Sequence, residues 1–176
     1  RRAELLELFR DNVYGRSPGR PAQLKFESSP GERAMDGAAT LKRIVIISRQ
    51  NDREHRFDMT LFLPTARGGP APVFLLLNNR PVSNTDPTRR ERSDFWPAEQ
   101  VVARGYAIAA IQVSDLAPDD KERYRDGVIR LFDDEAGARP DTAWAALAAW
   151  AWGASRAMDY FETDPARLRE ARTRSD

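Results

Sequence analysis

Two apolar runs with a helical stretch between them constrain the fold of this chain most strongly. Residues 72–79 read PVFLLLNN and residues 106–113 read YAIAAIQV, so apolar side chains occupy consecutive positions in both. Such runs are typical of parallel strands that are covered on both faces. Residues 95–104 between them predict a helix that Gly105 closes. A strand, a helix and a second strand parallel to the first form the unit of an α/β sheet.

The elements on either side extend this unit. A further helix is predicted from a cap at Asp141 or Thr142 to about Glu162, which gives a doubly wound order of strands and helices. Before the parallel strands, residues 41–49 and 57–63 predict two strands with a polar turn between them, hence a hairpin. An antiparallel hairpin that leads into a doubly wound parallel sheet with flanking helices is the entry pattern of an α/β hydrolase.

The remaining segments are shorter or more polar. Residues 3–13 predict an amphipathic helix that ends at Gly15, and residues 23–27 predict a short strand. Residues 28–39 and 114–140 are predicted as loops because polar residues, Gly and Pro dominate them. The length of 176 residues fits one domain or a large part of one.

Composition excludes several classes of site. The net charge of +1 gives no overall field for nucleic acid, and the Arg-rich runs at 89–92 and 167–174 predict solvated surface. There is no Cys and one His, His55, so Cys-based or His-rich metal sites are excluded and no cofactor is expected. His55 lies in a polar stretch, which favours a solvated ring. No apolar run reaches the ~20 residues of a membrane span, and no signal peptide is visible, although the chain begins at Arg1 without Met.

Ser155 is the one serine in a neighbourhood that resembles a nucleophile elbow. The run Gly153-Ala154-Ser155-Arg156-Ala157 has the small residues that such a turn needs. An elbow also needs a buried strand directly before the serine, whereas residues 145–152 read AALAAWAW and strongly favour a helix. Ser155 is therefore predicted to lie inside a helix, where Gly153 permits close packing against the sheet.

The same helix carries a tryptophan cluster. Trp144, Trp150 and Trp152 could form a platform that stacks on sugars, but they point around a helix with almost no polar face. A helix that is apolar nearly all round is expected to be buried between the sheet and further structure. Core packing is therefore the favoured role of these side chains.

Three blocks of the sequence resemble one enzyme family. They read FWPAEQVVARGYAIAAIQVSDLAPD, DGVIRLF and AWAALAAWAWGASRAMDYFETDP, and they resemble the glucuronoyl esterases of carbohydrate esterase family 15, whose relatives are often labelled acetylxylan esterases. The likeness runs from about Leu5 to Pro165. It implies a secreted or periplasmic serine esterase that acts on polysaccharide or small-molecule esters of the plant cell wall, with no nucleic-acid or membrane partner. A serine nucleophile, an Arg beside it, a carboxylate and a His carry the family's reaction.

The sequence departs from the family after Pro165. There the family continues into a hydrophobic strand and an elbow, whereas this chain reads ARLREARTRSD. We therefore expect the catalytic residues to lie beyond residue 176, none of them in this chain, and the chain alone to be inactive. The expected organisation is one partial hydrolase domain, with a lead-in at 1–40, the sheet and its helices at 41–165, and an atypical charged tail at 166–176.

Loops at the carboxyl ends of the parallel strands are where this fold builds its site. Asn79 and Arg80 follow the first strand, where a main-chain N–H often contributes to an oxyanion hole. Asp115 follows the second strand and is a candidate on the substrate side. An alternative hypothesis is a complete, non-catalytic α/β binding module. A nucleotide-binding fold is not supported, because no Gly-x-Gly-x-x-Gly follows a strand.

Overall fold

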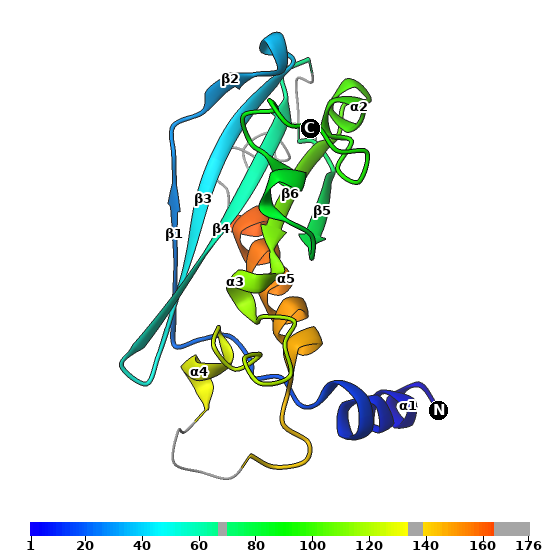
Figure 1. The fold of residues 1–176 in the computed structure, drawn as a ribbon, viewed down its shortest axis with the longest axis vertical. Coiled ribbons are helices and arrows are strands. Elements are labelled where there is room, and N and C mark those ends of the chain that lie inside the picture. The colour runs from blue at the N-terminus through cyan, green and yellow to red at the C-terminus, as the bar shows by residue number, and fades with distance from the viewer. Residues whose placement is uncertain (67–69, 134–138, 164–176) are drawn as a thin grey trace, which may run out of the picture.

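The computed structural model describes residues 1–66, 70–133 and 139–163 (Figure 1). In this part of the chain, one sheet of six strands has the order β1-β3-β4-β6-β5, with β2 paired to β3. Its strands are β1 (Gln23–Ser28), β2 (Glu32–Ala34), β3 (Ala39–Gln50), β4 (Arg53–Pro64), β5 (Val73–Asn78) and β6 (Ala107–Gln112). The sheet is mixed, because β5 and β6 are parallel. The pairs β1–β3, β3–β4 and β4–β6 are antiparallel. The predicted α/β sheet with an antiparallel entry is confirmed.

The hairpin of β3 and β4 is longer and tighter than predicted. Both strands have 12 residues, and Gln50 pairs directly with Arg53. The turn therefore consists of Asn51 and Asp52, both with positive φ (51° and 59°), as a type I′ hairpin turn requires. His55 was expected in the turn, but it lies on β4 opposite Ser48.

The parallel strands occupy one side of the sheet. β5 pairs with β6 from Val73 opposite Ala107 to Asn78 opposite Gln112. β6 is buried along nearly its whole length because it lies between β4 and β5. β5 is the edge strand, and its Phe74 side chain is 57% exposed. The expectation that both strands are covered on both faces is therefore right for β6 and wrong for β5.

The helices differ from the predictions mainly in where they begin. They are α1 (Arg2–Phe9), a π-helical turn (Arg10–Tyr14), α2 (Ala98–Ala103), α3 (Val113–Leu116), α4 (Ile129–Phe132) and α5 (Ala146–Thr163). α2 begins only after Pro97, because a residue before proline disfavours helical backbone. α5 begins after the predicted caps at Asp141 and Thr142. The Thr142 carbonyl instead accepts a hydrogen bond of 2.7 Å from the Arg16 N–H.

Both segments predicted as loops contain short elements. Residues 28–39 include β2 and a 3-10 turn, and residues 114–140 include most of α3 and all of α4. These elements are three or four residues long, so no periodic pattern marks them. They form because they pack against the sheet, which sequence periodicity does not report.

Two hydrophobic clusters cover the two faces of the sheet. On one face α3, α4 and α5 pack against residues such as Ile46, Met59 and Ile111. On the other face α2 and Trp96 pack against Leu41, Phe62 and their neighbours. Figure 1 shows α5 running behind the sheet, with β5 at the opposite edge from β1. The sheet is thus held from both sides, and its strand ends are left to build loops.

α5 is buried on one side only. Trp152 on α5 and Trp144, two residues before the helix, are 4% and 3% exposed, and Trp150 is partly buried against the same core, which confirms the predicted role of the three side chains. Ser155 lies within the helix, as predicted, and its hydroxyl donates to the Ala151 carbonyl at 3.1 Å. Leu147 and Met158, however, are 57% and 47% exposed, so the expectation of a helix buried all round is wrong.

Gly153 permits a close approach of α5 to another helix. A Cβ at this position would lie 2.3 Å from Cδ1 of Leu116 on α3. Leu116 is fully buried, so the side chain has no free space into which it could move. The predicted close packing at Gly153 is therefore confirmed, although the partner is α3 and not the sheet.

Candidate functional site

The carboxyl ends of β5 and β6 lie at the same end of the sheet, where the side-chain amides of the two last strand residues hydrogen-bond to each other. Asn78 is fully buried, and its Nδ2 donates to Oε1 of Gln112 at 2.6 Å. Both amides also donate to the main-chain carbonyl of Arg80, at 3.1 Å from Asn78 and 3.0 Å from Gln112. The Arg80 N–H in turn donates to Oδ1 of Asn78 at 3.3 Å. The main chain after β5 is therefore fixed at its first turn.

This arrangement bears on the predicted oxyanion donors. Asn79 and Arg80 lie on the first turn after β5 and both are exposed. The Arg80 N–H is already engaged by Asn78, so it is the weaker donor of the two. The Arg80 guanidinium lies over the Phe95 ring, 4.6 Å from its centre, which joins the beginning and the end of the loop 79–97.

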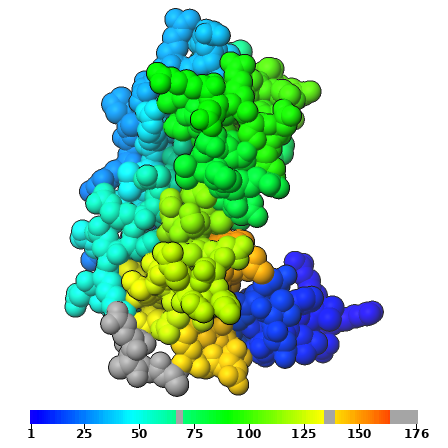
Figure 2. All heavy atoms as spheres, viewed as in Figure 1, coloured from blue at the N-terminus to red at the C-terminus, as the bar shows by residue number. Residues whose placement is uncertain are grey.

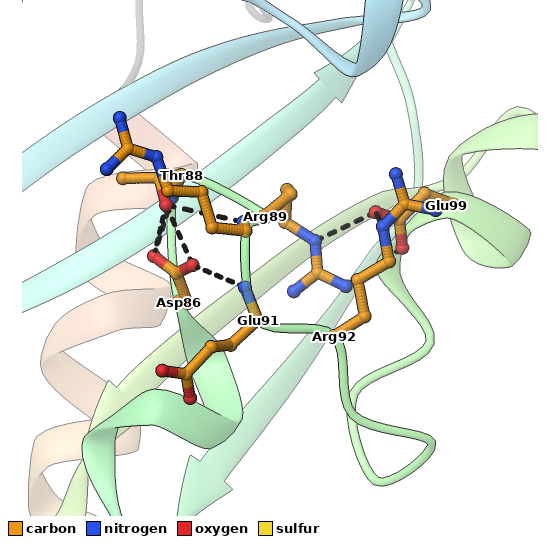
Figure 3. Close-up of polar contacts among 7 residues, drawn as sticks. Asp86, Thr88, Arg89, Glu91, Arg92 and Glu99 are labelled. Carbon is orange, nitrogen blue, oxygen red and sulfur yellow. Dashed lines mark hydrogen bonds and ion pairs between the residues drawn. The ribbon is translucent and has the colours of Figure 1, made fainter.

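Asp86 organises the middle of this loop. Its carboxylate accepts hydrogen bonds from the Thr88 hydroxyl (2.7 and 2.8 Å) and from the Thr88 and Glu91 N–H groups (2.8 and 2.9 Å) (Figure 3). Partial desolvation would raise its pKa. Together with the Arg90 N–H, these donors outweigh that effect and lower the pKa of Asp86 to about 2. Asp86 is therefore ionised at any physiological pH and holds the loop in one conformation.

Arg89 then ties the loop to α2. Its Nε and Nη2 bind the Glu99 carboxylate at 2.9 and 2.8 Å, a bidentate pair, and its guanidinium lies 5.0 Å from the Trp96 ring centre. Arg92 approaches the same carboxylate at 3.5 Å (Figure 3). The hydrogen bonds from Arg89 chiefly lower the pKa of Glu99. Arg89 is only 8% exposed, so the prediction of a solvated Arg-rich run at 89–92 is wrong for this residue. The second run, 167–174, lies outside the described residues.

Asp115 stands on α3, which directly follows β6. Burial raises the pKa of its carboxyl group, and the nearby negative charge of Asp58 raises it further. Because β5 and β6 are adjacent and parallel, Asp115 and the Asn79–Arg80 turn lie at the same end of the sheet, beyond the carboxyl ends of the two strands. The structure therefore brings the predicted site residues to one end of the sheet, as expected for loops at strand carboxyl ends.

A serine, a histidine and an aspartate also meet nearby, but they are not arranged as a catalytic triad. His55 faces Ser48 across the hairpin, and the Asp115 main chain hydrogen-bonds the His55 ring. In a triad the carboxylate orients the His and the serine hydroxyl bonds to it. Here Ser48 is fully buried, and among the described residues neither its Oγ nor His55 Nε2 has a hydrogen-bond partner. Ser48 is therefore out of reach of a substrate.

The environment of His55 differs from the prediction of a solvated ring. The ring is partly buried beneath α3, and this burial lowers its pKa, while the hydrogen bond to the Asp115 main chain opposes the effect. Its placement on β4 instead of in the turn is the cause, because alternate residues of β4 face the core. His55 is therefore a neutral structural side chain at pH 7.

The Asn78–Gln112 pair and the Asp86–Arg89–Glu99 network were not predicted. A signal for the first exists, because each apolar run ends in an amide residue, FLLLN and AIAAIQ. No sequence signal marks the second, because only the folded loop brings Asp86, Arg89 and Glu99 close together. Among the residues that the structure describes, no group of His, Cys, Asp or Glu side chains could hold a metal ion. No helix in the described ranges is long and apolar enough to cross a bilayer.

Comparison with known proteins places this fold in a class. No family model matches the sequence. A carbohydrate esterase from an unknown prokaryotic organism is 30% identical over 93% of this chain and 44% of its own length. A glucuronoyl esterase from Solibacter usitatus is 35% identical, with a TM-score of 0.78 over 93% of this chain and 48% of that structure. A family 15 glucuronoyl esterase from Teredinibacter turnerae is 26% identical, with a TM-score of 0.73 over 94% of this chain and 42% of that structure.

The fold is therefore that of the α/β-hydrolase carbohydrate esterases. More particularly, the chain is similar over nearly its whole length to glucuronoyl esterases of carbohydrate esterase family 15, which confirms the resemblance found in the sequence. The chain spans about half the length of the relatives it matches.

Proposed function

We propose that this chain is the amino-terminal part of a serine carboxylic-ester hydrolase that acts on plant cell-wall polysaccharide esters, such as glucuronoyl or acetyl esters of xylan. The observation that carries the proposal is the 35% identity to the Solibacter usitatus glucuronoyl esterase at a TM-score of 0.78. The resemblance also makes secretion or a periplasmic location part of the proposal. The chain matches 48% of that structure, so the rest of the site would come from further polypeptide.

In this proposal the chain supplies one wall of the site and not its catalytic groups. The serine, the Arg beside it, the carboxylate and the His would lie beyond residue 176. The Asn79 N–H would face the ester oxygen that becomes negative when the serine attacks, because the Asn78–Gln112 pair fixes this turn. Arg80 would hold the loop through Phe95, and Asp115 would line the substrate side.

The positions of His55, Ser48 and Ser155 support this division of roles. A general base must accept a proton near the working pH and reach the reacting atom. Ser48, the serine opposite His55, is fully buried, so this pair cannot present a nucleophile and its base to a substrate. Ser155 already donates to the Ala151 carbonyl within α5, where no strained turn presents it. The described residues thus contain scaffold and rim, which fits a part of a hydrolase domain.

A fusion experiment tests the proposal. The chain would be joined, as one polypeptide, to the part of the Solibacter usitatus esterase that it does not match, and hydrolysis of a glucuronic acid ester would be measured. We expect the fusion to hydrolyse the ester and the isolated chain to give only the buffer rate. In the fusion, Asn79→Pro removes the N–H and is expected to lower kcat by about 10²-fold. Glu91→Ala, on the same loop, serves as the control, because the Glu91 side chain is exposed and only its main-chain N–H takes part in the loop's hydrogen bonds.

Two results would overturn the proposal. One is hydrolysis by the isolated chain that Ser155→Ala abolishes, which would make Ser155 the nucleophile. The other is hydrolysis by the isolated chain that His55→Ala abolishes, which would give the partly buried histidine a catalytic role. A folded fusion without activity on glucuronoyl, acetyl or p-nitrophenyl esters would favour a non-catalytic binding module.

A further inference from the structure

Two side-chain amides, those of Asn78 and Gln112, end the two parallel strands side by side. The two residues are paired directly in the register of β5 and β6, and their side chains continue the face of the sheet that carries Leu76 and Ile108 beneath α2. Asn78 is fully buried, so its amide would be costly there without hydrogen-bond partners. Figure 2 shows that the green surface of the loop 79–97 borders the yellow-green surface of the segment after β6. The amide pair therefore lies where the two segments that frame the predicted site begin.

The Asn78 amide is the centre of this network. Its Nδ2 donates to Oε1 of Gln112 at 2.6 Å and to the main-chain carbonyl of Arg80 at 3.1 Å. A longer contact of 3.4 Å joins the same Nδ2 to the Pro81 carbonyl. Its Oδ1 accepts from the Arg80 N–H at 3.3 Å and from Nδ2 of Asn84 at 3.4 Å. A carbonyl oxygen can only accept a hydrogen bond, so these partners fix the direction in which the Asn78 amide points.

Gln112 gives the Arg80 carbonyl a second donor. Its Nε2 donates to that oxygen at 3.0 Å, while its Oε1 accepts from Asn78. The two lone pairs of the Arg80 carbonyl are thus engaged by amides from two different strands, which holds this carbonyl on the side of the amide pair. A carbonyl oxygen turned towards a bound ester would repel the negative charge that develops on the ester oxygen during attack. Gln112 therefore keeps a repulsive dipole away from the predicted site.

The pairing of β5 with β6 sets the direction of the Asn79 N–H. The Ala107 N–H donates to the Pro72 carbonyl at 2.9 Å, so the even-numbered residues of β5 direct their N–H and C=O groups towards β6. Asn78 continues that series, and across its trans peptide bond the N–H of Asn79 points the opposite way. This N–H makes no hydrogen bond within the part of the chain that the structure describes. The next N–H along the chain, that of Arg80, is engaged by Asn78, so Asn79 carries the available donor of the turn.

We propose that Gln112 is a positioning residue of the esterase, which presents the Asn79 N–H to the ester oxygen by locking the first turn after β5. The inference rests on the proposed function and deepens it, because it gives a role to a side chain of the other parallel strand. In this role Gln112 does not contact the substrate and acts through Asn78 and the Arg80 carbonyl. A donor that is already in place needs no reorientation when charge develops on the ester oxygen. Loss of the lock is therefore expected to lower kcat and to leave KM unchanged.

The experiment uses the single-chain fusion described above and hydrolysis of a glucuronic acid ester. Gln112→Met keeps the length of the side chain and removes both of its hydrogen-bonding atoms, and it is expected to lower kcat about tenfold at unchanged KM. Gln100→Met makes the same change at an exposed position of α2 and is expected to leave both constants unchanged. Circular dichroism checks that the variants are folded. If Gln112→Met does not fold, Gln112→Glu replaces it, because Glu keeps the acceptor for Asn78 and lacks the donor to Arg80.

A double-mutant cycle separates positioning from a general effect on the structure. Asn79→Pro removes the N–H that Gln112 is proposed to present. In that background Gln112→Met is expected to lower kcat by less than about twofold, because nothing remains to be positioned. A tenfold loss in both backgrounds would overturn the inference, and so would a change confined to KM or an unchanged kcat in the Gln112→Met fusion.

The 176-residue chain gives a second readout that needs no catalysis. By NMR, hydrogen exchange of the Asn78 side-chain amide and of the Arg80 N–H is expected to be about fivefold faster in Gln112→Met than in the native chain, and unchanged in Gln100→Met. Equal exchange in all three chains would overturn the inference whatever the activity. An inactive native fusion together with faster exchange in Gln112→Met would instead overturn the proposed function and leave the locked turn standing, so the two failures are distinguishable.

Discussion

The two edges of the sheet are finished differently. At β1, Lys25 binds Glu27 at 2.9 Å and Arg56 of β4 binds the same carboxylate at 2.9 Å, while Phe26 turns inward and packs edge-on against Tyr160. At β5, the strand VFLLLN carries no charge, and the exposed Phe74 contacts only Tyr106 among the aromatic rings described. Charged side chains protect an edge from unwanted pairing. The β1 edge is therefore built to face water, and the β5 edge has the composition of a strand that another strand or partner covers.

The largest expected effect separates two phenylalanines, one at each edge. Phe26→Ala removes a ring packed on the core and is expected to lower the free energy of unfolding by about 2 kcal/mol. Phe74→Ala removes a ring that is 57% exposed and is expected to cost less than about 1 kcal/mol. Urea denaturation followed by tryptophan fluorescence measures both. Equal costs would contradict the contrast between the edges.

Asp86 gives a smaller effect on the β5 side of the molecule. Asp86→Asn removes acceptor capacity from the loop that follows β5 and is expected to cost about 1 kcal/mol at pH 7, because the carboxylate is partly solvated. Its pKa is lowered from 3.8 to about 2, so its contribution is complete above 3.8 and is lost as the pH falls towards 2. Denaturation of the variant and the native chain between pH 7 and pH 3 measures the difference. A difference that vanished already at pH 5 would show that another group is responsible.

His55, on β4 in the middle of the sheet, is expected to respond at higher pH. Burial lowers its pKa below 6.5, so the unfolded chain binds the proton more tightly. The stability linked to His55 is complete above 6.5 and falls as the pH is lowered below that value. Between pH 7 and pH 5 we expect the unfolding temperature to fall by about 2 °C, and His55→Gln to remove this dependence. Differential scanning calorimetry of both chains makes the comparison, and an unchanged slope in the variant would contradict the assignment.

The smallest effect is expected at the ion pairs of β1. Lys25→Gln breaks the pair with Glu27, but both side chains are largely solvated. Exposed pairs contribute little to stability, so no measurable change in the free energy of unfolding is expected. The same variant should, however, self-associate more readily at high protein concentration, which light scattering detects. Phe74→Lys should have the opposite effect at β5.

The comparison also shows which parts of the fold were predictable. The runs before Asn78 and Gln112 predicted β5 and β6 because consecutive apolar residues are a local signal. The exposure of Phe74 was not predictable, since it depends on strand order, which places β5 at the edge. α3, α4 and β2 were not predicted, because an element of three or four residues is too short to show a hydrophobic period.

The site followed the same rule. The rule that loops at the carboxyl ends of parallel strands build the site predicted that Asn79, Arg80 and Asp115 lie at one end of the sheet. Their catalytic relevance stays a prediction. The contacts that hold them, above all those of Gln112 with Asn78 and of Arg89 with Glu99, join residues 10 to 34 positions apart, so only the folded chain reveals them.

The two-residue turn at Asn51 and Asp52 has a consequence for the order of folding. It joins two strands of 12 residues each, so their pairing closes almost no loop and costs little chain entropy. Hairpins of this kind form within about 1–10 μs, whereas a ribosome adds about 5–20 residues per second. β6 begins at Ala107 and is made well after β4 ends at Pro64. The hairpin can therefore stand as a template on the emerging chain, with β1 already joined to one side, while the other side waits for β6 to be synthesised.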